Sequence, residues 1–182
     1  MSKALFLDRD GIINIDHGYV HKKEDFDFVD GIFELCLLAI NKGYQIFVIT
    51  NQAGIARGYY DQAAFERLTQ WMISVFAEQN IMITKVYYCP HHPSKGVNEF
   101  VMKCECRKPA PGMLLKAEKE FSINLEHSVF IGDKISDMQA AKNAGVECRI
   151  LLNSRYTEES ADEELAGVCK INTLKQAISL LK

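Results

Sequence analysis

The sequence predicts an α/β fold built around a parallel sheet. Apolar runs rich in Ile, Val, Leu and Phe recur at 3–7, 45–50, 84–88, 128–132 and 147–152, and helical patterns lie between most of them. This alternation is typical of a parallel sheet, because crossover helices join parallel neighbours. The 182 residues, 48% of them hydrophobic, fit one Rossmann-like three-layer domain over 1–182 without a large cap domain.

The helices are predicted from apolar residues at helical spacing and from signals at their ends. The first begins after Asp30, a plausible N-cap, and ends before Gly43, which stands where a C-terminal glycine belongs. Further helices are expected after Asp61, after Pro111, over 136–144 and over roughly 174–181.

Two connections are longer than this architecture needs, one over 12–30 and the other over 90–110. Long loops in compact domains are often functional. Both follow strands, so they leave the carboxyl edge of the sheet, where ligands bind in parallel α/β folds. The acidic segment 157–164 is expected to be a helix-prone surface without a function.

Composition and charge exclude several kinds of partner. The net charge of -3 gives no basic field of the kind that nucleic acids or anionic membranes require. The first residues lack the apolar core of a signal peptide, and no apolar run approaches membrane-spanning length. We therefore expect a cytoplasmic protein, compatible with a monomer, that acts on a small molecule.

Carboxylates follow two of the predicted strands. The first strand ends in Asp8 and Asp10 before Gly11, and the fourth ends in Asp133. The alternative for each segment is a solvated turn. Carboxylates that meet at one sheet edge favour Mg²⁺ instead, because this ion takes a few carboxylates plus phosphate oxygens and water. Asp8, Asp10 and Asp133 are the expected ligands; Asp137 either joins them or forms a helix-start ion pair with Lys134.

Two further segments suit a phosphate group. The second strand ends in Thr50 and Asn51, and Arg107 and Lys108 stand just before a predicted helix. A guanidinium offers a planar fork to phosphate oxygens, and an ammonium offers a compact charge. Read alone, Thr50 is a strand-end hydroxyl that bonds to nearby backbone, and the basic pair is a solvated turn.

The order and context of Asp8, Asp10, Thr50, Lys108 and Asp133 resemble the four motifs of the haloacid dehalogenase-like superfamily. The resemblance covers residues 5–137. It implies that Asp8 is the nucleophile that forms an aspartyl-phosphate and that Asp10 protonates the leaving oxygen and then activates water. Crowding by neighbouring carboxylates favours the protonated fraction that Asp10 needs. Thr50 and Lys108 would stabilise charge on the transferring phosphoryl group.

A second metal site is predicted in the loop after the third strand. Cys89, His91, Cys104 and Cys106 supply three thiols and one imidazole, the ligand set of a closed, structural Zn²⁺ site over about 89–106. His91 is preferred over His92 because its spacing from Cys89 mirrors that of the later cysteine pair. Incidental cysteines are the alternative. The isolated cysteines are expected to be core residues; they are Cys36, Cys148 and Cys169.

Within the superfamily, the loops resemble those of the zinc-bearing heptose 1,7-bisphosphate phosphatases more than those of the histidinol-phosphate phosphatases, whose zinc loop is typically shorter. The resemblance implies removal of the C7 phosphate of a sugar bisphosphate in nucleotide-activated heptose and lipopolysaccharide biosynthesis. The implied substrate contacts are Asp16, His17, Gly18, Tyr19, Thr50, Asn51, Gln52, Ala53, Arg107, Lys108 and Lys134.

Three alternatives to this function remain, one another phosphatase and two without catalytic activity of this type. A histidinol-phosphate phosphatase would use the same chemistry on another substrate. A phosphoacceptor module would carry its acceptor aspartate on the third strand, which here ends in Cys89. A zinc-stabilised interaction domain would not need the five motif residues. The sequence gives neither the preferred anomer at C1 nor the oligomeric state.

Overall fold

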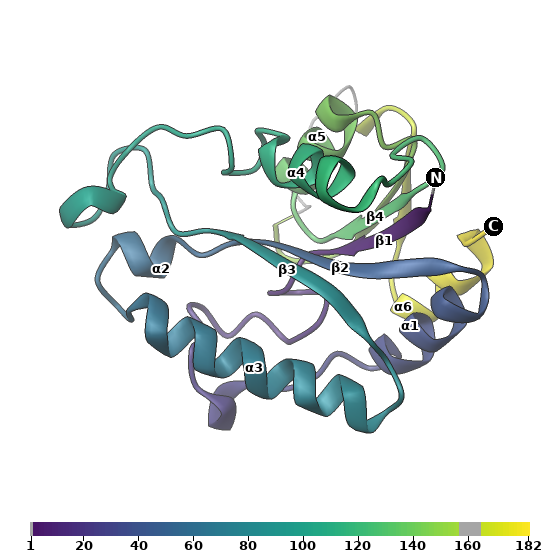
Figure 1. The fold of residues 1–182 in the computed structure, drawn as a ribbon, viewed down its shortest axis with the longest axis horizontal. Coiled ribbons are helices and arrows are strands. Elements are labelled where there is room, and N and C mark those ends of the chain that lie inside the picture. Colours follow the sequence, from purple (N-terminus) through teal and green to yellow (C-terminus); the bar gives the residue numbers. More distant parts are fainter. Residues whose placement is uncertain (1, 157–164) are drawn as a thin grey trace.

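The computed structural model describes residues 2–156 and 165–182, so the predicted acidic segment 157–164 lies outside the described residues. The described chain folds around a six-stranded sheet in the order β3-β2-β1-β4-β5-β6, in which every neighbouring pair is parallel (Figure 1). This topology confirms the predicted fold class. The strands are β1 (Lys3–Leu7), β2 (Tyr44–Asn51), β3 (Ile83–Cys89), β4 (Val129–Gly132), β5 (Cys148–Leu152) and β6 (Val168–Ile171).

Helices cover both faces of the sheet and produce three layers. In Figure 1, α1, α3 and α6 lie below the sheet, and α4 and α5 lie above it. The short α2 extends the end of β2. The helices are α1 (Ile32–Asn41), α2 (Ala53–Ala56), α3 (Gln62–Glu78), α4 (Gly112–Phe121), α5 (Ile135–Ala144) and α6 (Leu174–Ala177), with 3₁₀ turns at Lys23–Asp25, Asn98–Phe100 and Ile178–Leu180.

Two apolar cores lie on opposite sides of the sheet, and β1 contributes to both. Leu5 and Leu7 pack in the core under α1 and α3, whereas Ala4 and Phe6 pack in the core under α4 and α5. A strand that is buried on both faces needs apolar residues at every position. Burying a Leu or Phe side chain contributes about 1.5–3 kcal/mol, so β1 is anchored firmly where its polar end emerges.

Three local predictions were wrong in whole or in part. The N-cap of α1 is Gly31, with a positive φ of 85° and no side-chain cap, so Asp30 lies one residue before the N-cap, and its carboxylate is 3.2 Å from the Lys175 ammonium. The last helix was predicted correctly in extent but not in type, because an α-helical turn over Leu174–Ala177 is followed by a 3₁₀ turn over Ile178–Leu180. Cys169 is exposed, because it lies on β6, a sheet-edge strand that the sequence analysis did not predict.

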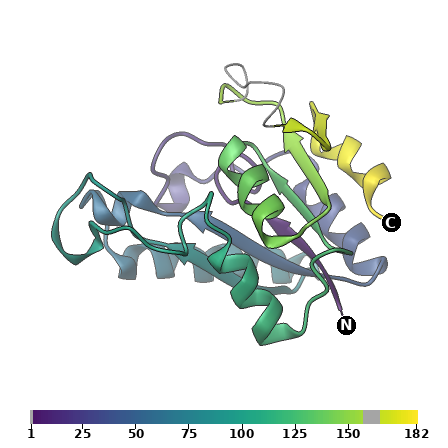
Figure 2. The ribbon, with the colours of Figure 1, turned by 90° about the horizontal axis from the view of Figure 1, so that it is seen from above.

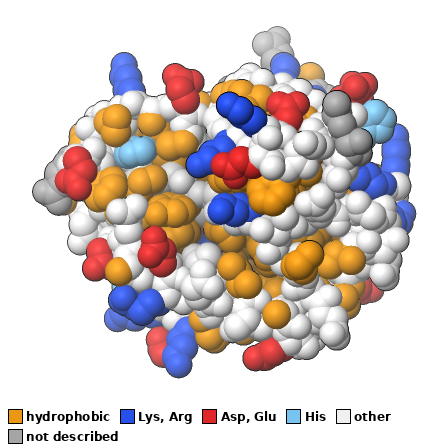
Figure 3. Space-filling model, in the orientation of Figure 1, with side chains coloured by type: hydrophobic (Ala, Val, Ile, Leu, Met, Phe, Trp, Pro, Cys, Tyr) orange, Lys and Arg blue, Asp and Glu red, His pale blue; other side chains and the backbone are white. Residues whose placement is uncertain are grey.

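Both long connections are present, and they lie at the carboxyl edge of the sheet (Figure 2). The connection over 90–110 rests on α2, since the Val97 N–H donates to the Ala56 carbonyl at 2.7 Å. Gly96 fits this contact because a Cβ there would lie 2.1 Å from the same oxygen. Among the described residues, no helix is both long enough and apolar enough to span a bilayer. In Figure 3, basic side chains on the visible face are scattered among acidic and apolar ones.

Candidate active site

Three neighbouring strands deliver the predicted catalytic residues to one edge of the sheet. Because β1 lies between β2 and β4, the residues that follow these strands meet where the strands end. Carboxylate oxygens of Asp8, Asp133 and Asp137 lie within 4.8 Å of one another, and all three residues are buried. The structure thus joins two of the predicted magnesium ligands and adds Asp137 to the group.

Two glycines make room for these carboxylates. A Cβ on Gly11 would lie 2.3 Å from Asp133 Oδ2, and Gly11 has a φ of +98° that other residues rarely adopt. A Cβ on Gly132 would lie 2.4 Å from Asp137 Oδ2. The glycine that marked the turn after β1 therefore serves a second purpose, the close approach of Asp133.

Burial and mutual repulsion make the ionised carboxylates unfavourable in the absence of a cation. Burial, together with the charge of Asp137, raises the pKa of Asp8 to about 6. Burial, together with the charge of Asp8, raises the pKa of Asp133 to about 8. Asp133 Oδ1 is also buried without a hydrogen-bond partner, and the nearest ammonium, on Lys134, is 3.9 Å away. An unpartnered carboxylate oxygen beside two other carboxylates fits a hard divalent cation such as Mg²⁺.

Lys108 places a cation at the centre of the group. Its Nζ lies 2.9 Å from Asp8 Oδ1 and 2.7 Å from Asp137 Oδ1, and it donates to the Ile49 carbonyl at 2.8 Å. Burial alone would lower the pKa of Lys108, but Asp137 and Asp8 raise it, so the ammonium stays charged. Asn51 holds the Lys108 main chain by donating to its carbonyl and accepting from its N–H, each at 3.1 Å.

Asp137 has a different partner from the one considered in the sequence analysis. Its carboxylate pairs with the Lys108 side chain and accepts the main-chain N–H of Lys134 at 3.0 Å, which caps α5. The Lys134 ammonium instead reaches Asp16 at 3.3 Å. The helix-start ion pair between Lys134 and Asp137 is therefore replaced by two separate pairs.

The Asp10 side chain stands apart from the other carboxylates. Its Oδ1 accepts from Arg9 Nη2 at 2.8 Å and from Asn14 Nδ2 at 3.1 Å, and its Oδ2 accepts from Gln52 Nε2 at 3.1 Å. The Asp10 carboxylate thus lies outside the Asp8–Asp133–Asp137 group. The crowding expected at Asp10 acts on Asp8 and Asp133 instead.

Arg9 is a site residue that the sequence analysis missed. Its side chain is almost fully buried near the rings of Phe26 and Phe65, and Nη2 also donates to the Val20 carbonyl at 2.6 Å. Arg9 therefore ties the 12–30 loop to Asp10. Its position between Asp8 and Asp10 could have indicated this role, because a buried arginine is almost always paired with a carboxylate.

The predicted substrate residues of the 12–30 loop differ in their surroundings. Asp16 accepts from the Tyr156 hydroxyl at 3.0 Å, and Arg155 donates to the Asp16 carbonyl at 3.2 Å. Burial would raise the pKa of the Asp16 carboxyl, but the charge of Lys134 and hydrogen bonds from the Gly18 N–H and the Tyr156 hydroxyl lower it. Arg155 and Tyr156 come from the connection after β5 and had no sequence signal, since their only link to the site is contact with a distant loop.

The remaining predicted contacts line the rim. His17 pairs with Asp27 at 2.8 Å, and Tyr19 packs edge-to-face on Tyr59 with ring centroids 4.7 Å apart. Gly18 donates its N–H to Asp16. Ala53 begins α2 beside the strand end. Arg107 is directed toward the zinc loop and donates to the His91 carbonyl at 3.1 Å.

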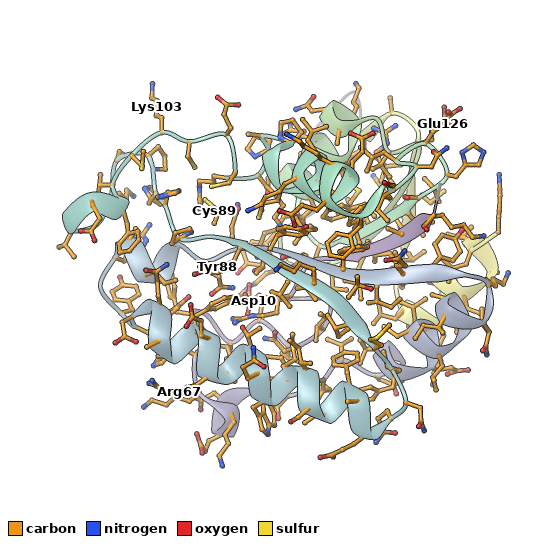
Figure 4. The ribbon with its side chains drawn as sticks, viewed as in Figure 1. Asp10, Arg67, Tyr88, Cys89, Lys103 and Glu126 are labelled. Carbon is orange, nitrogen blue, oxygen red and sulfur yellow. The ribbon has the colours of Figure 1, made fainter. Side chains whose placement is uncertain are left out.

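The four predicted zinc ligands form a compact group at the end of β3 (Figure 4, Cys89). Cys89 Sγ lies 3.5 Å from Cys104 Sγ and 3.1 Å from Cys106 Sγ, and His91 Nδ1 lies 3.4 Å from Cys106 Sγ. These separations approach the ~3.8 Å edge of a tetrahedron with Zn–S bonds of ~2.3 Å. His92 lies elsewhere in the loop, where Nδ1 accepts the Ser94 and Lys95 N–H groups. Three free thiols and one imidazole nitrogen fit Zn²⁺.

The chain is similar in sequence to several known proteins. The HAD-hydrolase-like family model matches residues 105–177. A Campylobacter jejuni protein named D-glycero-alpha-D-manno-heptose-1,7-bisphosphate 7-phosphatase is 52% identical over 86% of each chain. A Photorhabdus laumondii protein named D-glycero-beta-D-manno-heptose-1,7-bisphosphate 7-phosphatase is 44% identical, over 98% of this chain and 95% of that one.

A solved structure is also similar over nearly the whole chain. It is the D,D-heptose 1,7-bisphosphate phosphatase of B. bronchiseptica, complexed with magnesium and phosphate. Its TM-score is 0.81 at 27% identity, and the match covers 98% of this chain and 97% of that one. The likeness therefore extends across both long loops as well as the sheet.

Mg²⁺ should raise the melting temperature more at pH 8 than at pH 6. With its pKa raised to about 8, folded Asp133 binds a proton that the unfolded chain has released, so the metal-free protein loses stability as pH rises toward 8. Mg²⁺ needs the ionised form and removes this loss. Thermal unfolding with and without Mg²⁺ should show an extra gain of about 3 °C at the higher pH, equivalent to ~1 kcal/mol.

Asp133→Asn is the control for this measurement, since it removes the charge and keeps the side-chain volume. The variant should lose most of the Mg²⁺-dependent gain at both pH values. Equal gains for the unmodified protein at pH 6 and pH 8 would contradict the assignment of Asp133 to the metal.

Zinc removal should release the 90–110 loop. The four proposed ligands come from both arms of this loop, so a metal would join the arms more strongly than the few hydrogen bonds between them, and metal binding of this type contributes ~10–16 kcal/mol in small modules. Cys104→Ser should lower zinc content and make the loop sensitive to limited proteolysis, with Mg²⁺ kept in the buffer. Cys169→Ser, an exposed thiol outside the group, is the matched control. Unchanged protease resistance in the zinc-free protein would refute the role.

Proposed function

Since this chain belongs to the family of the D-glycero-D-manno-heptose-1,7-bisphosphate 7-phosphatases, we propose that it removes the C7 phosphate of a heptose 1,7-bisphosphate. The observation that carries the proposal is the buried pairing of Asp8 with Lys108 beside Asp133. A nucleophilic carboxylate, a fixed cation and a metal-binding carboxylate in one buried group are what phosphoryl transfer requires.

Asp8 is the proposed nucleophile, and its two oxygens have separate tasks. Oδ1 accepts the Arg9 N–H at 2.8 Å and the Lys108 ammonium at 2.9 Å, which fixes the carboxylate. Oδ2 forms the bond to phosphorus as the bond between phosphorus and the C7 oxygen breaks. When bound by Asp8, Asp10 and Asp133, Mg²⁺ would neutralise phosphoryl oxygens and reduce the repulsion between them and the incoming carboxylate.

Asp10 is the proposed proton carrier. It donates a proton to the departing C7 oxygen, which gives the sugar hydroxyl and an ionised Asp10. It then takes a proton from the water that attacks the aspartyl-phosphate, so that inorganic phosphate leaves and both aspartates return to their starting states.

Lys108 and Thr50 stabilise the charge that spreads over the phosphoryl oxygens. Thr50 Oγ1 accepts a hydrogen bond from Gln52 Nε2 at 2.8 Å, so its own hydroxyl proton is left for the phosphate. Lys108 keeps its position because Asn51 and Ile49 hold its main chain and its ammonium. Preorganised donors of this kind need no rearrangement when the reaction occurs.

The 12–30 loop, α2 and the zinc loop would bind the sugar and its second phosphate. Of the side chains in this rim, Arg107 and Lys134 supply cations, and Asp16 supplies a carboxylate for sugar hydroxyls. In this proposal Zn²⁺ is structural, and the protein works in the cytoplasm as a monomer. Histidinol phosphate is the rival substrate, because the same catalytic group would hydrolyse it.

A phosphate-release assay should separate the two substrates. With Mg²⁺, the protein should hydrolyse heptose 1,7-bisphosphate in preference to histidinol phosphate, because its loops match the heptose enzymes. Both C1 anomers should be assayed, since relatives are named for each. Preferential turnover of histidinol phosphate would overturn the proposed substrate while leaving the phosphatase chemistry intact.

Asp8→Asn should lower turnover by about 10³-fold or more, because an amide cannot form the covalent intermediate. Zinc content and the far-ultraviolet circular dichroism spectrum should not change. Asp61→Asn is the matched control and should keep full activity, because Asp61 is an exposed carboxylate that caps α3 outside the proposed sugar-binding loops, and asparagine can form the same cap. Retained activity in Asp8→Asn would refute the nucleophile assignment.

A further inference from the structure

The Gln52 side chain connects two of the proposed catalytic residues. Its Nε2 donates to Asp10 Oδ2 at 3.1 Å and to Thr50 Oγ1 at 2.8 Å, and the residue is only 2% exposed. Both N–H groups of the carboxamide are therefore used inside the protein. The resemblance had implied that Gln52 contacts the substrate, but this side chain is already committed to Asp10 and Thr50.

Tyr60 determines which way the Gln52 carboxamide faces. The Tyr60 hydroxyl donates to Gln52 Oε1 at 2.5 Å, and burial raises the pKa of Tyr60 above its ordinary value, so the hydroxyl keeps its proton. In the flipped orientation the Gln52 amide nitrogen would face Tyr60 and could not accept from its hydroxyl, and Oε1 would meet an ionised Asp10 carboxylate with no proton between the two oxygens. The contact from Tyr60 therefore selects the orientation in which an N–H faces Asp10.

Tyr60 is itself fixed from two sides. A Cβ on Gly54 would lie 2.2 Å from the Tyr60 ring, so only glycine lets the ring approach α2 so closely. The His21 ring stacks on Tyr60 with centroids 4.9 Å apart and planes 10° apart. Because His21 belongs to the 12–30 loop, the network also reaches the loop that would hold the sugar.

The contacts to Asp10 identify the oxygen that handles the proton. Both lone-pair directions of Oδ1 are used, by Arg9 Nη2 and Asn14 Nδ2. Among the described residues, Oδ2 accepts a hydrogen bond from Gln52 Nε2 alone, which leaves one lone pair for a proton. Since Gln52 fixes the position of Oδ2 against Thr50, it controls where that proton meets the leaving oxygen.

We propose that Gln52 is a positioning residue for Asp10 and that Tyr60 acts through it: the Tyr60–Gln52 pair aims Asp10 Oδ2 at the oxygen of an alkyl leaving group. The proposal rests on the proposed phosphatase function. In the first half-reaction the proton passes from Asp10 Oδ2 to the C7 oxygen as the phosphorus–oxygen bond breaks. Neither residue touches the substrate or forms a bond to phosphorus.

The test compares leaving groups, because only a basic alkoxide needs the proton from Asp10. The value of kcat/KM reports the steps up to alcohol departure. Gln52→Ala should lower kcat/KM about tenfold for heptose 1,7-bisphosphate and less than about twofold for 4-nitrophenyl phosphate, whose phenolate leaves without protonation. Tyr60→Phe, which removes only the hydroxyl, should lower the sugar-phosphate value about threefold.

The chain offers a matched control and a coupling test. Gln62 Nε2 donates to the Tyr88 hydroxyl at 3.0 Å on the surface, so Gln62→Ala and Tyr88→Phe make the same chemical changes outside the site. Both controls should leave the two kcat/KM values unchanged. In the double variant, Tyr60→Phe should add no further loss to Gln52→Ala, because Tyr60 acts through Gln52.

Three results would overturn the proposal: equal losses on both substrates, no loss on the sugar phosphate, or additive losses in the double variant. Failure of the proposed substrate gives a different pattern. If the unmodified protein cleaves 4-nitrophenyl phosphate but not heptose bisphosphate, the comparison proceeds with whichever alkyl phosphate of a sugar-phosphate panel it hydrolyses best. The leaving-group difference then still decides the role of Gln52.

Discussion

The buried ammonium of Lys108 is the interaction on which the site depends. It lies between Asp8 and Asp137, and Asp133 stands beside them with the Lys134 ammonium 3.9 Å away, so the three carboxylates outnumber the buried Lys108 cation. Removing one partner from a buried ion pair typically costs about 3–5 kcal/mol, because the other charge remains without solvent. Burial, together with the excess negative charge, raises the pKa values of Asp8 and Asp133, and the same negative charge would favour a divalent cation. The same buried group would thus both bind the metal ion and stabilise negative charge on the phosphoryl group.

Several otherwise separate features serve to hold this ammonium in place. Asn51, at the end of β2, clamps the Lys108 main chain with two hydrogen bonds. Cys106 stands two residues before Lys108 and belongs to the proposed zinc group, while Cys89, another member, ends β3. A metal that joined these cysteines would anchor the chain on both sides of Lys108 to the sheet. The proposed structural metal and the catalytic cation are thereby linked through three residues of backbone.

The sequence predicted what depends on strand order and local spacing. Apolar runs placed Asp8, Thr50 and Asp133 at strand ends, and parallel pairing then brought those ends together. The cysteine and histidine spacing predicted the group around Cys89 for the same reason. Contacts between distant loops had no such periodic signal: Tyr156 reaches Asp16 across 140 residues of chain, and Tyr60 finds Gln52 only because Gly54 admits its ring. The partner of Asp137 could not be predicted either. Lys108 and Lys134 were both available, and only the packing of α5 decides which of them Asp137 contacts.

The loops that surround the site also contact one another, so more than one loop can influence which sugar the protein prefers. The zinc loop rests on α2 through Val97, Tyr19 of the 12–30 loop packs on Tyr59 after α2, and Arg155 binds the other side of the same 12–30 loop. A change in any one loop therefore shifts its neighbours. Asp8 and Lys108 are fixed by buried contacts to the sheet and to each other, so loops of this kind can alter the preferred sugar while these two residues keep their geometry. Asp10 is different, because Asn14 and the Arg9–Val20 contact connect it directly to the 12–30 loop. The proposed Tyr60–Gln52 pair is a further connection, which runs from His21 of the same loop to the proton carrier.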